Sequence, residues 1–432
     1  MVKPITAMTH DTDIPQGYKA TALGIIPQEW EVRPLNYLGA ICSGGTPDTE
    51  VAEYWNGDIA WCTPSDITKL DTKYIESTEV KITAKGLKES SATLLPPRSI
   101  VVCTRATIGN AAICNTEIAT NQGFKNIIPN EKTNPEWLYY IIIYSKPRLV
   151  RFGCGSTFLE VSKKDFSRFK IAVPPLAEQR KIAEVLSVWD EAIEKQARLI
   201  EKLALRKRAL MQRLLSAKLR LPGFSEPCKK IKLGDIGHFL SSNTLSRDCL
   251  NEQIGNIKNI HYGDILIKLP TIVDASFIHI PYVNDDVIVK SDYLKNGDII
   301  FADTAEDYTV GKAIEIINIQ AIPVTSGLHT IPFRPKSGIF VNRFLGYYVN
   351  STDYRRQLQP LIQGIKVYSI SKTALCKTTL KIPTLSEQTA IAEVLTAADR
   401  EIELAKEKLE RLRRQKRGLM QQLLTGKKRV KY

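Results

Sequence analysis

The chain has 432 residues, which at roughly 100–200 residues per domain predicts several folding units. Apolar residues make up 43% and charged residues 25%, a balance that excludes a disordered or collagen-like chain. The net charge is +14, from 60 Lys and Arg against 46 Asp and Glu, and such a basic excess favours a polyanionic partner.

Cysteine use and apolar runs indicate the cellular compartment. The eight cysteines form no CxxC pair, which argues against a zinc ribbon or a disulfide framework. The longest strongly apolar run, 137–144, is far shorter than the roughly 20 residues that a bilayer requires, and the N-terminus lacks the apolar core of a secretory signal. We therefore expect a soluble, cytoplasmic protein with no metal of its own and no membrane partner.

Residues 27–173 predict a first globular stretch that is mostly β. Short β-branched and aromatic runs are separated by Pro, Gly, Asn and Asp. An apolar strand follows a turn in PPRSIVVCTRATIGNAAI (96–113), and a helix is expected at 137–144. The stretch closes with a glycine loop and Ser-Lys in GSTFLEVSKKDF (155–166).

Residues 174–220 predict a long helix. Proline precedes its start, Glu178 falls in its first turn, and its interior contains no proline. From Ile182 to Leu214, eight of ten positions spaced alternately four and three residues apart are apolar or Ala, the seam of a coiled coil. Lys207 interrupts this seam, where it could fix the register or extend its ammonium group outward.

The second half of the chain repeats the first. Residues 231–382 resemble 27–173 weakly, with a glycine loop and Ser-Lys in GIKVYSISKTAL (364–375) and an expected helix at 343–354. Residues 383–429 match 174–220 at a constant offset of 209, with 23 identities in 47 positions. In this match Lys416 is the equivalent of Lys207. The organisation is therefore domain–helix–domain–helix with pseudo-twofold symmetry.

Charge predicts the direction in which the two helices pair. The first helix is acidic on balance up to Glu201 and carries only basic charges beyond it, and the second changes in the same way at Glu410. An antiparallel pair would place each basic half beside an acidic half, with one domain at each end. The same pairing could absorb much of the basic excess, so the net charge by itself does not establish a nucleic-acid partner.

These residues resemble a known family, the specificity subunits of type I restriction-modification systems. The resemblance rests on the duplicated PPLAEQ…IAEVL…LMQRLL element and on KATALGIIPQEWEVRPLNYLG (19–39), SGGTP (43–47) and GDIAWCTPSDI (57–67). It covers nearly the whole chain and implies an α+β fold in which two long helices, forming an antiparallel coiled coil, separate two mostly β target recognition domains. The implied segments are 1–173, 174–220, 221–382 and 383–432. One departure is SSNT (241–244) in place of the glycine-rich GGTP loop.

The resemblance also implies a function. A specificity subunit is a non-catalytic DNA-recognition subunit that reads a bipartite, asymmetric sequence in double-stranded DNA. It holds two methyltransferase subunits, which methylate adenine at N6, and through them restriction subunits that cleave DNA. S-adenosylmethionine, ATP and Mg²⁺ are then expected on the partner subunits, with no cofactor and no catalytic residue in this chain.

The residues themselves contain no convincing catalytic motif. VGKA (310–313) lacks the upstream glycine and the Ser or Thr of a phosphate-binding loop, and the five histidines show no metal-ligand spacing. Asp48, Glu79 and Lys81 fit a loose metal-nuclease pattern, which recurs by chance. Two alternatives remain open: a self-sufficient nuclease, in which those three residues meet and bind metal, and a coiled-coil scaffold that binds only proteins.

Candidate DNA contacts are polar or forked side chains on predicted loops. In the first domain they are Ser43, Thr46, Thr104, Arg105, Thr107, Asn110, Asn121 and Gln122, with Thr157 and Lys163 near phosphate. In the second domain they are Asn243, Thr304, Asp307, Lys312, Ser326 and Lys366. Each competes with an ordinary role in a turn, because Asn, Ser and Thr favour turns in any loop.

Overall fold

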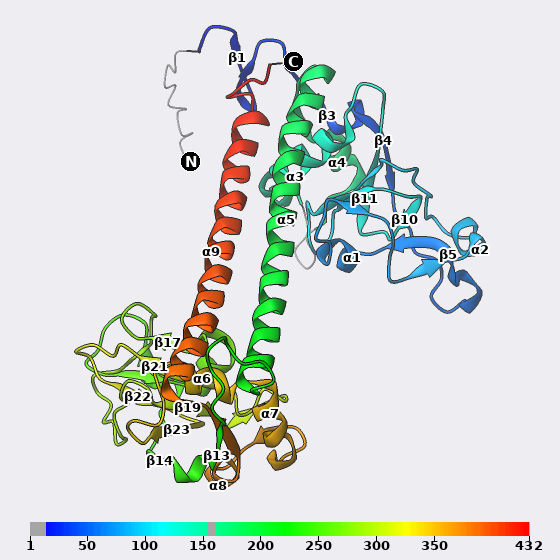
Figure 1. The fold of residues 1–432 in the computed structure, drawn as a ribbon. Helices are drawn as coiled ribbons and strands as arrows, with labels where there is room; N and C mark the ends of the chain where they lie inside the picture. The colour runs from blue at the N-terminus through cyan, green and yellow to red at the C-terminus, as the bar shows by residue number, and fades with distance from the viewer. Residues whose placement is uncertain (1–13, 154–159, 432) are drawn as a thin grey trace. The chain divides into compact units, whose positions relative to one another are not determined.

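The computed structural model describes residues 14–153 and 160–431 and divides the chain into two compact units. Unit 1 comprises residues 1–198 and 406–432, and unit 2 comprises residues 199–405. The long helices α5 (Leu176–Leu215) and α9 (Leu385–Leu423) each contribute one half to either unit (Figure 1). The compact units therefore differ from the division by sequence, which treats each helix as a segment of its own.

Unit 1 is built around a five-stranded sheet of order β4-β11-β8-β9-β6, in which only the β9–β6 pair is parallel. A second sheet has the order β10-β5-β7, and two-stranded pairs are formed by β1 with β2 and by β3 with β12. The strands are β1 Tyr18–Thr21, β2 Gly24–Pro27, β3 Glu31–Pro34, β4 Gly39–Ser43, β5 Trp55–Cys62, β6 Tyr74–Ile75, β7 Lys81–Ile82, β8 Ile100–Cys103, β9 Ala111–Cys114, β10 Ile118–Thr120, β11 Phe124–Pro129 and β12 Lys170–Val173. The shorter helices are α1 Pro64–Thr68, α2 Ala84–Lys88, α3 Pro135–Phe152 and α4 Lys163–Arg168.

Unit 2 repeats this topology. Its five-stranded sheet has the order β14-β23-β19-β21-β17, again with only the last pair, β21–β17, parallel. Its strands are β13 Lys229–Lys232, β14 Gly237–Phe239, β15 Leu250–Asn251, β16 Lys258–Ile260, β17 Ile272–Asp274, β18 Tyr282–Val283, β19 Ile299–Ala302, β20 Thr304–Ala305, β21 Ala313–Ile317, β22 Val324–Ser326, β23 Thr330–Pro335, β24 Tyr368–Ser369 and β25 Thr379–Ile382. Its shorter helices are α6 Phe344–Val349, α7 Thr352–Leu358 and α8 Lys372–Cys376.

The helix expected at 137–144 is confirmed within α3, but the helix expected at 343–354 is wrong as a single element. It is divided into α6 and α7 because the side chain of Asn350 bonds to β21 and that of Ser351 caps a second helix. The Asn350 side chain donates to the Ala313 carbonyl at 2.8 Å and accepts from the Ala313 N–H at 3.2 Å. The Ser351 hydroxyl then accepts the Tyr354 N–H and caps a new helix.

The hydrophobic core of each unit includes both long helices. In unit 1, Leu186 of α5 and Leu423 of α9 belong to the cluster that surrounds Trp137. In unit 2, Leu214 of α5 and Leu395 of α9 belong to the cluster of the second domain. The predicted seam is therefore the face that each helix buries. No helix among the residues that the structure describes has both the length and the apolarity to cross a membrane.

Within each unit the two helices run antiparallel, as the charge pattern predicts. In unit 1 the start of α5 lies beside the end of α9, and in unit 2 the end of α5 lies beside the start of α9 (Figure 1). Near the start of each long helix lies a buried glutamate. It pairs with an arginine that follows the end of the other long helix. Glu178 accepts two hydrogen bonds from Arg429, at 2.7 and 3.0 Å, and Glu387 accepts two from Arg220, both at 2.6 Å.

The two seam lysines bind aspartates of the opposite helix. In unit 2, Lys207 donates to Asp399, and its ammonium lies 5.3 Å from the centroid of the Tyr347 ring. In unit 1, Lys416 donates to Asp190 and lies 5.1 Å from the centroid of the Tyr140 ring. The register alternative therefore agrees with the structure, because each lysine has one specific charged partner at one layer of the pair.

In unit 2 the carboxylate of Glu315 caps the start of helix α6, and unit 1 has no carboxylate at the corresponding position. Glu315 on β21 pairs with Ile299, the position that Ile113 occupies opposite Ile100 in unit 1. Its carboxylate accepts the backbone N–H of Arg343 and, at 2.8 Å, that of Gly346 at the start of α6. The start of α6 has no side-chain cap of its own. Burial of the carboxyl raises the pKa of Glu315 to about 7, against the opposing effect of the two N–H groups.

We expect Glu315→Gln to remove a pH dependence of stability. Between about pH 4.5 and 7 the native carboxyl keeps a proton that the unfolded chain has released, so the free energy of unfolding falls as pH rises, by up to about 3 kcal/mol. Urea unfolding at pH 5, 6, 7 and 8 measures this difference between wild type and variant. The exposed Glu306→Gln should retain the dependence, and an identical pH profile for Glu315→Gln would contradict the assignment.

Candidate nucleic-acid interface

Three loops of unit 1 meet at one end of its sheets. The SGGTP loop after β4 lies against the β10–β11 loop, because Gly45 donates its N–H to the Thr120 carbonyl at 2.9 Å and the Thr46 hydroxyl donates to Gln122. The β8–β9 turn joins them through the Thr104 N–H, which donates to the Gly123 carbonyl at 2.8 Å. The glycines are required by this contact: a Cβ on Gly44 would lie 1.9 Å from the Asn121 carbonyl oxygen.

A small ionic cluster lies beside these loops. Glu160 pairs with Arg105 at 2.5 Å and with Lys125 at 3.6 Å. The hydrogen bond from Arg105 lowers the pKa of Glu160, while burial lowers the pKa of Lys125. Of the two cations, Arg105 is the one exposed to solvent, so the cluster presents a guanidinium group beside the three loops.

The predicted DNA contacts of the first domain fall into three groups by exposure. Arg105, Gln122 and Lys163 are exposed, and half-buried side chains are those of Ser43, Thr46, Thr107, Asn110 and Asn121. Thr104 is buried at 1% exposure, and its hydroxyl donates to the Gly123 carbonyl at 3.1 Å. Its side chain supports the loop and is not open to a ligand in this structure. Thr157 lies outside the described residues.

Unit 2 presents the corresponding loops with different side chains. Asn243 donates its N–H to the Ser326 carbonyl at 2.9 Å, as Gly45 does to Thr120 in unit 1. The N–H of Asp303 donates to the His329 carbonyl at 3.1 Å, the bond that Thr104 makes in unit 1. The sequence indicates the first equivalence through the weak match of the two domains, in which SSNT (241–244) stands in place of the GGTP loop.

The predicted contacts of the second domain also divide by exposure. Asp307 and Lys366 are exposed, and Thr304 and Lys312 are half-buried. Asn243 is 7% exposed and Ser326 fully buried, so neither side chain is open to a ligand here. Asn243 donates to the Asn259 side chain at 2.8 Å, and Ser326 shares a hydrogen bond of 2.6 Å with Thr330.

Sequence reasoning missed the counterpart of Lys163. In unit 1, Val161 donates its N–H to the Thr104 carbonyl, and in unit 2 Ile370 donates to Asp303 in the same way. Two residues further along the chain stand Lys163 and Lys372, each after a serine that caps a short helix. Lys372 therefore corresponds to Lys163, and the Ser-Lys pair shared by both domains was the signal for it.

Both acids of the loose nuclease pattern have partners of their own in unit 1. Glu79 pairs with Lys69, and its N–H donates to Asp66, while Asp48 accepts the N–H of Glu50. Within residues 14–153 and 160–431, no group of three His, Cys, Asp or Glu side chains is placed to hold a metal ion.

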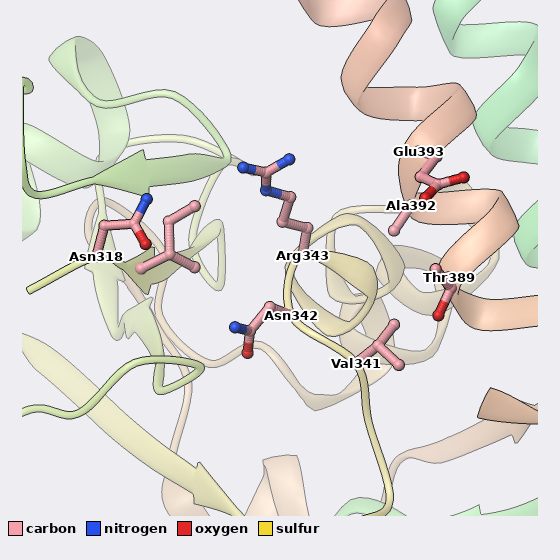
Figure 2. Close-up of a pocket in the computed structure, with 8 residues that line it drawn as sticks. Asn318, Val341, Asn342, Arg343, Thr389, Ala392 and Glu393 are labelled. Carbon is pink, nitrogen blue, oxygen red and sulfur yellow. The ribbon is translucent and has the colours of Figure 1, made fainter. Parts of the chain in front are cut away.

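A small pocket of unit 2 lies at the end of β21, away from these loops. It has a volume of about 240 Å³ and is lined by the end of β21, the start of α6 and the start of α9. Figure 2 shows Asn342 and Arg343 on one side and Thr389, Ala392 and Glu393 of α9 on the other. Since Thr304, Asp307 and Lys312 precede β21 and the pocket lies at its end, the pocket is no part of the candidate interface.

Comparison with known proteins agrees with this architecture. The sequence profile of the family described as type I restriction modification DNA specificity domain matches twice, at residues 27–204 and 225–414. The MjaVIII specificity subunit of Methanocaldococcus jannaschii is 26% identical over 424 residues, covering 94% of each chain. The MjaIX specificity subunit of the same organism is 40% identical over 193 residues, so the match spans 45% of that relative's length and 44% of this chain.

A solved structure shares the fold. Its title concerns complex assembly and conformational transition of the type I R-M system, and it superposes with a TM-score of 0.61 at 18% identity, covering 93% of this chain and 99% of that one. The two profile matches span more than half of the chain and coincide with the two repeated halves. The chain therefore belongs to the family of type I restriction-modification specificity subunits.

Proposed function

We propose that this chain reads a bipartite, asymmetric sequence in double-stranded DNA, each unit recognising one half-site with the loops described above. The observation that supports this most directly is the duplication of one loop framework with different side chains. Gly45 and Asn243 hold the same backbone position, as do Thr104 and Asp303. Two copies of one framework with unlike surfaces suit two unlike half-sites.

The chain is a non-catalytic subunit, so chemistry would come from partners. Two methyltransferase subunits would bind S-adenosylmethionine and methylate adenine at N6 in the target. Restriction subunits, recruited through the assembled methyltransferase, would use ATP and Mg²⁺ for cleavage. The name shared by the relatives, type I restriction enzyme specificity subunit, supports this assignment of roles.

A selection experiment tests the proposal. The chain, assembled with its methyltransferase subunits, is incubated with a random-sequence DNA library, and the bound fraction is sequenced. Two unlike short motifs at a fixed separation are expected. Enrichment of no motif by the full complex would favour the protein-binding scaffold instead.

Exchange of one domain tests whether each unit reads its own half-site. Replacing residues 27–173 by the first domain of another family member should change one half of the enriched sequence and leave the other half unaltered, because the loops of unit 1 come from that segment. The reciprocal exchange of residues 231–382 is the matched control. A change in both halves after either exchange would contradict independent reading by the two units.

A further inference from the structure

In both units, the turn between two central strands of the main sheet lies directly on a cation from a following helix. In unit 1 the turn joins β8 to β9, and a Cβ on Gly109 would lie 2.8 Å from Cγ of Lys146 on α3. In unit 2 the turn, which includes β20, joins β19 to β21, and a Cβ on Gly311 would lie 2.9 Å from Cδ1 of Leu358 and 3.3 Å from Nη1 of Arg355, both on α7.

The two glycines occupy the same position in their turns. Gly109 has φ of +83° and Gly311 has φ of +75°, a backbone region that favours glycine. Each donates its N–H to the carbonyl of the last residue of the preceding strand, at 2.8 Å in both units. The two turns therefore share this closing hydrogen bond, although the turn of unit 2 is longer, and a basic side chain lies against the glycine of each.

Each cation is bonded to its turn through a neutral group. Lys146 Nζ donates to Oδ1 of Asn110 at 2.7 Å, and Arg355 Nη2 donates to the Tyr308 carbonyl at 2.6 Å. Among the ion pairs of the described residues, neither cation appears, whereas the neighbouring Arg356 pairs with Asp353 at 3.5 Å. Arg355 Nη1 is moreover buried without a hydrogen-bond partner in the described part of the chain.

A half-buried cation that forms no ion pair is costly unless another anion completes it. Burial lowers the pKa of Arg355, an effect that the nearby carboxylate of Asp307 in the same turn opposes without reversing it. The lysine and the arginine lie under the turns that bear seven of the predicted contacts: Thr104, Arg105, Thr107, Asn110, Thr304, Asp307 and Lys312. In DNA complexes, phosphate contacts set the position and register of the protein while neighbouring side chains read bases. A cation that forms no ion pair among the described residues lies against both turns, and this suits such a division.

We infer that Lys146 and Arg355 are positioning residues, each of which holds one reading turn and has its charge completed by a backbone phosphate of the bound DNA. The inference rests on the proposed function and deepens it. Because the two cations serve different units, loss of one should disturb recognition of one half-site only.

The test uses Lys146→Met and Arg355→Met, which remove the charge and keep most of the volume. Each variant is assembled with the methyltransferase subunits and titrated with a duplex that carries the sequence enriched by the wild-type complex. Because each variant can neutralise one phosphate fewer, Kd should rise about fivefold at 0.15 M monovalent salt, and the slope of log Kd against log salt should fall by about 0.9. Single-base substitutions should be tolerated better in one half-site for Lys146→Met and in the other for Arg355→Met.

Charge-retaining and neighbouring variants are the controls. Lys146→Arg and Arg355→Lys should keep the wild-type salt slope, and so should Arg356→Met, which removes an ion-paired cation from the same helix as Arg355. An equal fall of the slope in Arg356→Met would overturn the inference, because the effect would then be one of general charge.

The remaining outcomes separate the inference from the proposed function. If the wild-type complex enriches a bipartite sequence but Lys146→Met and Arg355→Met bind it with unchanged slope, the inference fails and the proposed function stands. Weaker binding at an unchanged slope, with a lowered melting temperature, would show a merely structural role and also overturn it. If the wild-type complex enriches nothing, the proposed function itself fails.

Discussion

Glu178→Ala and Glu387→Ala are each expected to destabilise the chain by about 3 kcal/mol, because each removes the buried carboxylate of an ion pair. Of the arginines left behind, Arg429 is 32% exposed and still pairs with Glu29, and Arg220 is 25% exposed. The carboxyl of Glu178 is fully buried and that of Glu387 is 1% exposed. Glu178 also accepts the indole N–H of the buried Trp30 at 2.8 Å, which would lose its partner as well. Urea unfolding followed by circular dichroism measures the loss.

Two further variants make this result interpretable. Glu184→Ala removes an exposed carboxylate of the same helix, paired with Lys181, and should cost less than about 1 kcal/mol. Adding Arg429→Met to Glu178→Ala should recover part of the loss, because the cation that lost its buried partner is then gone. Equal destabilisation by Glu184→Ala, or no recovery in the double variant, would mean that the pair has no special role.

Lys207→Asp is expected to destabilise the helix pair by about 2–3 kcal/mol, since it places a carboxylate against Asp399 in a partly buried layer. Asp399→Lys should have a similar effect by placing two ammonium groups together. The double exchange, with Asp at 207 and Lys at 399, restores opposite charges and should recover most of the stability. The coupling energy from a double-mutant cycle, measured by urea unfolding, is expected to be about 2 kcal/mol.

The control for the charge exchange is Lys202→Asp, which reverses an exposed charge on the same helix. It should change stability by roughly 0.5 kcal/mol or less. Additive effects of Lys207→Asp and Asp399→Lys would contradict the pairing of these residues. Such additivity would also remove the argument that the seam lysines select the antiparallel register.

Much of the architecture could be predicted because its signals are periodic and local. The seam from Ile182 to Leu214 follows from residue spacing alone, and the repeat at an offset of 209 indicates a second helix of the same kind. The change of charge sign along each helix predicts antiparallel pairing, because long-range charge complementarity can be read from a linear pattern. The break between α6 and α7 was missed, since it depends on an Asn350 side chain that bonds a strand distant in the sequence.

The accessibility of the residues in the candidate interface could not be predicted in this way. Sequence alone determined that this protein has two copies of one domain, joined through a helix pair, with polar loops suited to a polyanion. Only the tertiary structure decided which loop residues remain accessible: Asn243 is buried by its bond to Asn259, whereas Gly45 at the same position is confined by the backbone of Ala92. It also decided that Lys146 and Arg355 lie beneath the turns. These outcomes depend on contacts between residues far apart in the chain, for which neither spacing nor composition provides a signal.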